Sequence, residues 1–124
     1  MRDRFRRGQL ADQRGRYAED LAQAALECDG WTILARRIRT PAGEIDLIAE
    51  KEGFLSVIEV KARPKLADAA AAVSLRQQER LVAATDIVLA NNPQWGINGV
   101  RFDLLLVDSA GVVRRIANAF RGNG

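Results

Sequence analysis

Histidine is absent from this 124-residue sequence, and cysteine occurs only once, at Cys28. Without histidine the usual zinc ligand sets cannot form, and hydrolysis by a serine or cysteine paired with an imidazole base is excluded. A single cysteine also excludes an internal disulfide. Acid–base chemistry must therefore come from Asp, Glu, Lys and Tyr, and any bound metal must be held by oxygen atoms.

Long apolar runs are also missing. No segment approaches the ~20 apolar residues that cross a bilayer, and the first sixteen residues contain no apolar stretch typical of a signal peptide. We therefore expect a cytoplasmic protein that does not enter the membrane. With 48% hydrophobic and 28% charged residues, the composition is typical of one folded domain and not of a disordered chain.

Aromatic residues are scarce, at 6% of the sequence, which leaves few rings for stacking against a ligand. We expect Trp31 and Phe102 to lie in the core and Tyr17 to lie on the apolar face of a helix. Trp95, in a loop rich in Asn, Pro and Gly, is the ring expected to be most exposed.

Positive charge is concentrated at the start of the chain. The first sixteen residues carry six arginines against two aspartates, a net charge of +4, whereas the formal charge of the whole sequence is +3. Guanidinium groups pair well with phosphate oxygens, so nucleic acid is one natural partner. A solvated terminal segment that only keeps the protein in solution is an equally good interpretation of the same cluster.

The spacing of apolar residues predicts helices and strands within one domain. In chain order we expect a helix at 8–28, strands at 31–38, 44–50 and 54–62, one long or two short helices within 67–90, and strands at 100–108 and 112–120. This order has an αβββαβ core and predicts an α/β (α+β) fold, with a central mixed sheet flanked by helices.

The segment GEIDLIAEKEGFLSVIEVKAR, residues 43–63, has the alternation of a half-buried hairpin. If Glu52 and Gly53 form a two-residue turn, the numbers of paired residues on the two strands add to 105. Asp46 then lies directly across from Glu59.

Because side chains alternate along a strand, one face is expected to carry Glu44, Asp46, Ile48, Leu55, Val57, Glu59 and Lys61. The other face is expected to carry the apolar residues Ile45, Leu47, Ile58 and Val60. Three carboxylates and one lysine therefore share a face on which an ordinary hairpin would place apolar side chains.

Two ionised carboxylates opposite each other repel, and a divalent cation offsets that repulsion. Mg²⁺ prefers one or two carboxylates together with water and a phosphate oxygen, and Mn²⁺ takes similar oxygen ligands. Lys61 could then orient or deprotonate a water that attacks phosphorus, or hold a phosphate oxygen. The alternative is an exposed face of an edge hairpin, on which the same residues form cross-strand ion pairs.

Glu19 offers a further carboxylate, from the predicted first helix. It lies one turn after Gly15, at the border of the apolar stripe. A glycine inside a helix costs about 1 kcal/mol relative to alanine, which hints at a close approach near Glu19. Helical glutamates are most often exposed, however, so spacing alone does not assign Glu19 to a site.

Asp46, followed thirteen residues later by Glu59-Val60-Lys61, resembles the PD-(D/E)XK motif of nucleases. The segments GRYAEDLAQAAL, GWTILARRIRTPAGEIDLIAE, VIEVKAR, RFDLLLVD and IANAF together resemble the YraN-like family, small bacterial proteins assigned to the restriction-endonuclease-like fold. The resemblance implies a single nuclease-like domain at 15–120. Residues 1–14 would precede it as a basic N-terminal arm, with flexibility allowed.

The resemblance also implies which residues form the site. The implied catalytic residues are Asp46, Glu59, Lys61 and Glu19, and the implied ligands of Mg²⁺ (or Mn²⁺) are Asp46, Glu59, Glu19 and the backbone carbonyl of Val60. Contacts to nucleic acid are expected from Arg6, Arg7, Arg14, Arg16, Arg63, Arg76 and Gln77. The family usually has a lysine where Gln77 stands, so a phosphate contact there would be weaker or would pass to Arg76.

Three functions remain open. The first is a metal-dependent endonuclease that hydrolyses phosphodiester bonds of DNA, with branched or single-stranded substrates included. The second is a non-catalytic nucleic-acid-binding module of the same fold. The third, a protein-interaction domain, is favoured only by the modest net charge and the low aromatic content. A homodimer is left open, because enzymes of this fold that cut both strands often act as dimers.

Overall fold

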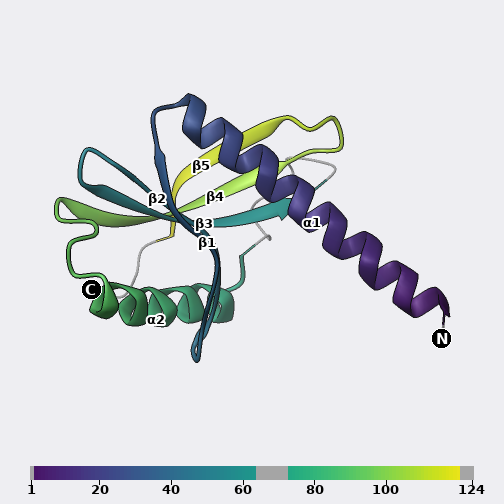
Figure 1. Cartoon of the computed structure of the whole chain (residues 1–124), viewed down its shortest axis with the longest axis horizontal. Helices are drawn as coiled ribbons and strands as arrows, with labels where there is room; N and C mark the ends of the chain where they lie inside the picture. The colour runs from purple at the N-terminus through teal and green to yellow at the C-terminus, as the bar shows by residue number, and fades with distance from the viewer. Residues whose placement is uncertain (1, 64–72, 121–124) are drawn as a thin grey trace.

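The computed structural model describes residues 2–63 and 73–120, without the side chains of residues 2–12, 14 and 120 (Figure 1). The described elements, in chain order, are α1 (Arg2–Cys28), β1 (Thr32–Thr40), β2 (Gly43–Lys51), β3 (Phe54–Ala62), α2 (Leu75–Asn91), β4 (Gly99–Val107) and β5 (Val113–Phe120). This is an α+β domain with a mixed sheet, compatible with the restriction-endonuclease-like fold that the sequence predicts.

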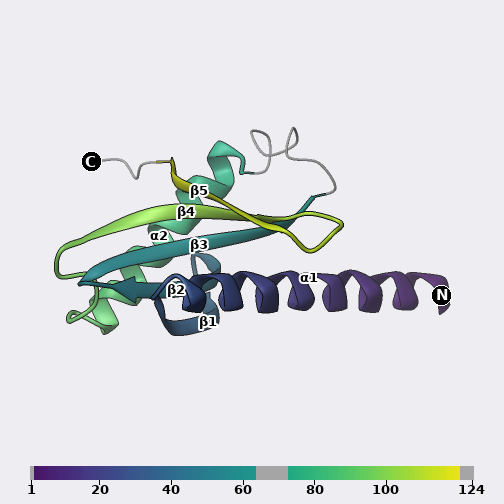
Figure 2. The ribbon, with the colours of Figure 1, turned by 90° about the horizontal axis from the view of Figure 1, so that it is seen from above.

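The five described strands form one sheet in the order β1-β2-β3-β4-β5. Neighbouring strands are antiparallel except for β3 and β4, which are parallel. A parallel pair needs a long crossover connection, and α2 lies in that connection. The helices α1 and α2 lie on opposite faces of the sheet, and the N-terminal half of α1 extends past its edge (Figures 1 and 2).

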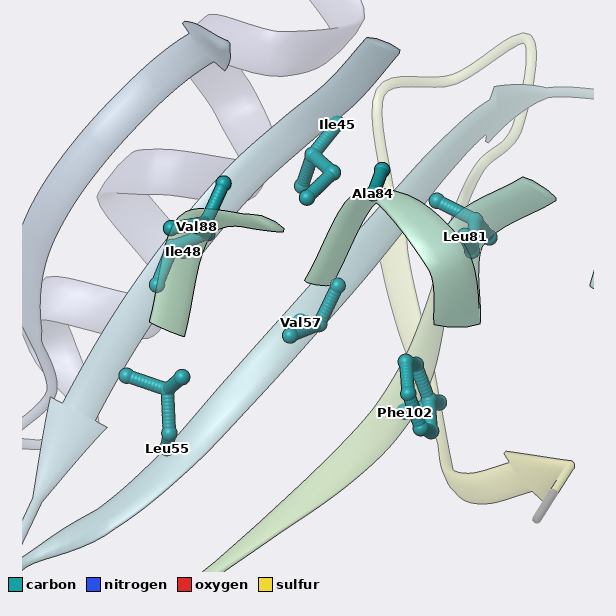
Figure 3. Packing of buried hydrophobic residues seen from close by; sticks show 8 residues of the cluster. All are labelled: Ile45, Ile48, Leu55, Val57, Leu81, Ala84, Val88 and Phe102. Atoms are coloured by element: carbon teal, nitrogen blue, oxygen red, sulfur yellow. The ribbon is translucent and has the colours of Figure 1, made fainter. Parts of the chain in front are cut away.

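Each helix buries apolar side chains against its own face of the sheet. The cluster on the α2 side consists of Ile45, Ile48, Leu55, Val57, Leu81, Ala84, Val88 and Phe102 (Figure 3). The cluster on the α1 side consists of Ala22, Leu26, Trp31, Leu47, Ala49, Ile58 and Leu105. Removing one large side chain from such a core typically costs about 2–5 kcal/mol, so these clusters hold the strands at fixed positions.

The hairpin register that the sequence predicts is confirmed from the turn to Leu47 and Ile58, but the predicted pair of Asp46 with Glu59 is not formed. Leu47 pairs with Ile58 and Lys51 pairs with Phe54, so the paired numbers add to 105. The two turn residues, Glu52 and Gly53, have φ angles of 54° and 79°. Two consecutive positive φ angles are the geometry of a type I′ turn, whose twist matches that of the flanking strands.

The predicted face of Ile45 is wrong. Alternation places Ile45 with Leu47, but Ile45 lies in the cluster on the α2 side, together with Ile48 (Figure 3). The pairing between β2 and β3 ends at Leu47 and Ile58, and Ile45 pairs with Ile38 of β1. The strand thus departs from strict alternation between Ile45 and Leu47, opposite Arg37 of β1, whose φ of 52° is left-handed.

The helix predicted within 67–90 begins at Leu75 in the described residues. Ser74 caps it, since the Ser74 side-chain oxygen accepts a hydrogen bond from the backbone N–H of Gln77 at 3.2 Å. A serine cap satisfies one of the unpaired N–H groups of the first turn. The part of the prediction that falls on 64–72 lies outside the described residues.

Two predictions for aromatic residues are wrong. Tyr17 is 61% exposed although it falls on the helical spacing of the apolar stripe, and Trp95 is partly buried against the cluster on the α2 side. Trp31 and Phe102 are buried, as predicted. The most exposed of the described tyrosine and tryptophan rings is therefore on α1.

The N-terminal helix begins earlier than the sequence predicts, at Arg2 and not at residue 8. The division into an arm at 1–14 and a domain at 15–120 stays a prediction. Neither described helix has a stretch long and apolar enough to cross a lipid bilayer.

Candidate functional site

The central feature of the site is the point where β2 and β3 separate. Their last backbone pair on this side is Leu47 with Ile58. One residue further, the side chain of Asp46 takes the place of the missing backbone partner, and its Oδ2 accepts a hydrogen bond from the N–H of Val60 at 2.8 Å. The Asp46 carboxylate is thereby fixed against β3, beside Glu59.

Glu59 is held by two donors although its side chain is almost completely buried. Its Oε1 lies 2.9 Å from the ammonium nitrogen of Lys61 and accepts a hydrogen bond from Nε2 of Gln77 at 2.7 Å. Lys61 lies two residues further along the strand, on the same face, as alternation predicts. Gln77 belongs to the first turn of α2, so the Ser74 cap also positions this contact.

The pKa of Asp46 lies well above that of an ordinary aspartate. Burial is the largest cause that raises the pKa of Asp46, to about 7, and repulsion from Glu59 is the next. The charge of Glu19 and a hydrogen bond with Glu59 raise the pKa further, while the hydrogen bond from Val60 partly opposes the shift. Asp46 therefore binds a proton far more readily than an ordinary aspartate does, and it is about half protonated near pH 7.

Glu19 is a buried residue, with 7% of its surface exposed, and not the surface glutamate that helical frequencies favour. Its Oε1 accepts a hydrogen bond from Nε of Arg37 at 2.7 Å, and Nε of Arg36 lies 3.4 Å from the same oxygen. The backbone of Arg37 is left-handed, with φ of 52°, which costs about 1–2 kcal/mol for an ordinary residue. The partly buried ion pair with Glu19 acts against that cost.

A cleft of about 340 Å³ opens onto the two carboxylates. Asp46 and Glu59 line it together with Gln77 and Arg80 of α2. Arg80 is a site residue that sequence reasoning missed. Its signal was present, because Arg80 follows Gln77 by three residues and therefore lies on the same face of the helix.

The oxygen atoms at this site suit a hard divalent cation. Asp46 and Glu59 are adjacent, and a divalent ion would replace the proton that burial, and then repulsion from Glu59, favour on Asp46. Among the side chains that the structure describes, no three of Asp, Glu, Cys or His are grouped as metal ligands. Two carboxylates would thus leave positions for the Val60 carbonyl, water and a phosphate oxygen, which is the usual surrounding of Mg²⁺.

The structure describes only some of the side chains that are predicted to contact nucleic acid. The side chains of Arg6, Arg7 and Arg14 lie outside the described part of the chain. Arg16 and Arg76 are exposed, on α1 and on the first turn of α2. Arg63 is half-buried, and its Nη1 donates a hydrogen bond to the carbonyl of Ala62 at 2.8 Å.

Comparison with known proteins gives consistent matches. The sequence profile described as "Uncharacterised protein family UPF0102" matches residues 18–107. A UPF0102 protein of Granulibacter bethesdensis is 56% identical over 93% of this chain and 73% of its own length. One of Azorhizobium caulinodans is 44% identical over 96% of this chain and 91% of its own length. A third, from Rhodopseudomonas palustris, is 48% identical over 86% of this chain and 82% of its own length.

Proposed function

Because the chain belongs to the UPF0102 family, the same family as the YraN-like proteins that its sequence resembles, we propose that it is a metal-dependent nuclease acting on DNA. One observation carries the proposal. Asp46 is fixed on the N–H of Val60 beside the buried Glu59, and Lys61 is paired with Glu59. The proposed setting is the cytoplasm, and the proposed reaction is hydrolysis of a phosphodiester bond.

Asp46 and Glu59, with the carbonyl of Val60, would hold Mg²⁺ or Mn²⁺. The bound ion would supply charge neutralisation at the phosphate and a water of lowered pKa. Gln77 fixes the orientation of Glu59 by its hydrogen bond, so the carboxylate keeps one rotamer before substrate binds. A side chain held in this way loses no rotamer entropy when the reaction begins.

Besides the charge of a metal ion, Lys61 would supply a positive charge from a side chain of the protein. Its ammonium nitrogen, 2.9 Å from Oε1 of Glu59, has further protons that can donate to a phosphate oxygen or orient the attacking water. Arg80, which lines the cleft, can bind a second phosphate oxygen. Lys61 and Arg80 are thus the two side-chain cations that would stabilise negative charge developing on the phosphate oxygens.

A specific observation supports a second candidate, a non-catalytic nucleic-acid-binding module. Glu19 is paired with Arg37, Glu59 is paired with Lys61, and Asp46 retains a proton near pH 7. Two of the carboxyl groups are therefore compensated by cations of this chain and the third in part by a proton, without a divalent ion. In that case the cluster holds the sheet together, and arginines on the surface bind the phosphates.

The test is cleavage of labelled single-stranded, duplex and four-way-junction DNA in Mg²⁺ or Mn²⁺. We compare the natural protein with Asp46→Asn, Lys61→Ala and a control, Asp86→Asn, which changes an exposed carboxylate of α2. The nuclease predicts a loss of about 100-fold or more in both site variants and no change in the control. Cleavage that persists in Asp46→Asn would contradict the proposed site.

Binding separates the two candidates when the natural protein does not cleave. Salt-sensitive binding of DNA that is the same for the natural protein and for Asp46→Asn would favour the binding module. Calorimetry with Mg²⁺ and Mn²⁺ adds an independent measurement. The nuclease predicts heat of binding for the natural protein and none for Asp46→Asn, whereas the binding module predicts none for either.

A further inference from the structure

A second cavity, of about 500 Å³, lies at the end of the sheet where the parallel strands β3 and β4 finish. Its walls come from Tyr17 and Ala18 of α1, from Ala62 and Arg63 at the end of β3, and from the turn between β4 and β5. The residues that line it differ from those that line the cleft of Asp46 and Glu59. We call it the Tyr17 pocket.

The Tyr17 pocket adjoins the candidate nuclease site along two elements. Tyr17 and Ala18 directly precede Glu19, and Ala62 directly follows Lys61. The carboxyl ends of parallel strands are a common place for ligands, because loops diverge there and leave an open crevice. The Tyr17 pocket and the cleft of Asp46 and Glu59 are thus connected through α1 and β3, the pocket on the α1 side of the sheet and the cleft on the α2 side.

The chemistry of the walls suits a flat aromatic ligand. Tyr17 lines the pocket and is 61% exposed overall, a large fraction for a ring on an otherwise apolar helical stripe. Next to it the walls are made of small residues, Ala18, Ala62 and Gly111, which leave space for a ring. The volume is within the range of about 300–1,000 Å³ that is typical of small-ligand pockets.

Polar groups occupy the rim of the pocket. Arg63 brings a guanidinium group, which suits a phosphate oxygen. Oδ1 of Asp108 accepts hydrogen bonds from the backbone N–H groups of Ala110 and Val112, each at 2.9 Å, so the turn between β4 and β5 is held in one conformation. An aspartate oxygen can also accept a hydrogen bond from the exocyclic amino group of a base.

We propose that the Tyr17 pocket binds one unpaired nucleobase of a single-stranded segment, with the base stacked on Tyr17 and its phosphate on Arg63. The faces of a base inside a duplex are covered by its neighbours, so a ring in a pocket stacks only on a base that has left the helix. The inference rests on the proposed function for its ligand, nucleic acid. It names the substrate class as DNA that contains an unpaired nucleotide.

The test measures binding without cleavage, with the full chain in EDTA. A fluorescent single-stranded oligonucleotide and the matching duplex are titrated against the natural protein, Tyr17→Ala, Tyr17→Phe and Arg63→Ala. Phe54→Ala is the matched control, because Phe54 is a partly exposed ring at the opposite end of β3. We expect Tyr17→Ala to weaken single-strand binding about 5- to 150-fold, while Tyr17→Phe and the control stay within twofold of the natural protein.

A photocrosslink locates the base. An oligonucleotide with one 5-iodouracil is irradiated in complex with the natural protein, and the modified peptide is identified by mass spectrometry. Modification at Tyr17 supports the pocket, whereas modification elsewhere overturns it. Equal single-strand affinity of Tyr17→Ala and the natural protein overturns it too, as does an equal loss of duplex affinity.

The two proposals fail in different ways. Binding in EDTA does not depend on hydrolysis. If the protein cleaves no DNA but its single-strand affinity depends on Tyr17, the pocket proposal is supported and the nuclease proposal is rejected. If cleavage depends on Asp46 but single-strand binding is unchanged in Tyr17→Ala, the nuclease proposal is supported and the pocket proposal is rejected.

Discussion

Asp46 is the residue whose chemistry depends most on its surroundings. Burial, and then the repulsion of Glu59, raise the pKa of Asp46 to about 7 from an ordinary value near 3.8. Between these two pH values the folded protein binds a proton that the unfolded chain has released. The free energy of unfolding therefore decreases as the pH rises from about 4 to 7, and the penalty is complete above pH 7.

We predict that Asp46→Asn raises the free energy of unfolding by about 1–3 kcal/mol at pH 8 and leaves it nearly unchanged at pH 3. Three pKa units correspond to about 4 kcal/mol at most, and coupling to Glu59 reduces the gain. The asparagine oxygen can still accept the hydrogen bond from Val60, so the backbone contact survives. Urea unfolding at the two pH values measures the difference.

The companion variant separates charge from hydrogen bonding. Asp46→Ala removes the acceptor of the Val60 N–H and is expected to cost about 1–3 kcal/mol at pH 3 relative to the natural protein. An Asp46→Asn variant that gained the same stability at both pH values would show that ionisation of Asp46 is not the cause.

At the scale of elements, Asp103 joins three strands through one buried carboxylate. The hydroxyl of Ser56 on β3 and Nη2 of Arg115 on β5 donate to its Oδ2, and the backbone N–H of Asn118 donates to Oδ1 at 2.9 Å. Burial alone would raise the pKa of Asp103, but the hydrogen bonds from Arg115, Ser56 and Asn118 outweigh it and lower the pKa. Its stabilising contribution is thus present above pH 4 and is lost as the pH falls further.

We predict that Asp103→Asn lowers the free energy of unfolding by about 2–4 kcal/mol at pH 7, because it leaves Arg115 without its buried partner.

Since β5 is an edge strand in the described sheet, its amides should exchange with deuterium sooner than those of β2. Denaturant unfolding and hydrogen exchange measure the two effects.

The control for this change is Asp29→Asn, which alters an exposed carboxylate 3.9 Å from Arg115. Exposed pairs of this kind contribute little, so the control should stay within about 0.5 kcal/mol of the natural protein. Equal losses in the two variants would contradict the role of Asp103.

For the whole molecule, the distribution of charge matters more than its total. The formal charge is only +3, yet the first sixteen residues carry +4. This basic segment lies on the part of α1 that extends past the sheet (Figures 1 and 2). A long-range attraction for phosphates can therefore act at a distance from the cleft of Asp46 and Glu59.

We predict that the triple change Arg6→Ala, Arg7→Ala and Arg14→Ala weakens DNA binding and reduces its dependence on salt. Each lost phosphate contact lowers the slope of log K against log salt by about 0.7–0.9, so the slope should fall by roughly 2–3. Alanine favours helix at least as well as arginine, so stability should stay within about 1 kcal/mol. An unchanged slope would show that these arginines do not contact the DNA.

By itself the sequence determined what neighbouring residues control. The Glu52-Gly53 turn and the alternation of the strands fix the register of the hairpin, and with it the shared face of Glu59 and Lys61. Turn chemistry and periodicity act over a few residues, and for this reason they can be deduced without a structure. The absence of histidine likewise restricted the chemistry to oxygen ligands and carboxylates.

Only the tertiary structure decided what depends on contacts between distant residues. The separation of β2 from β3 brings Asp46 to the N–H of Val60, and packing of β1 against α1 brings Arg37 to Glu19. Acidity follows from burial and from the sum of nearby charges, so the pKa of Asp46 has no local signal in the sequence. The exposure of Tyr17 has the same origin. Helical spacing predicts the face of α1 on which Tyr17 lies, but its exposure depends on where the sheet ends relative to that face.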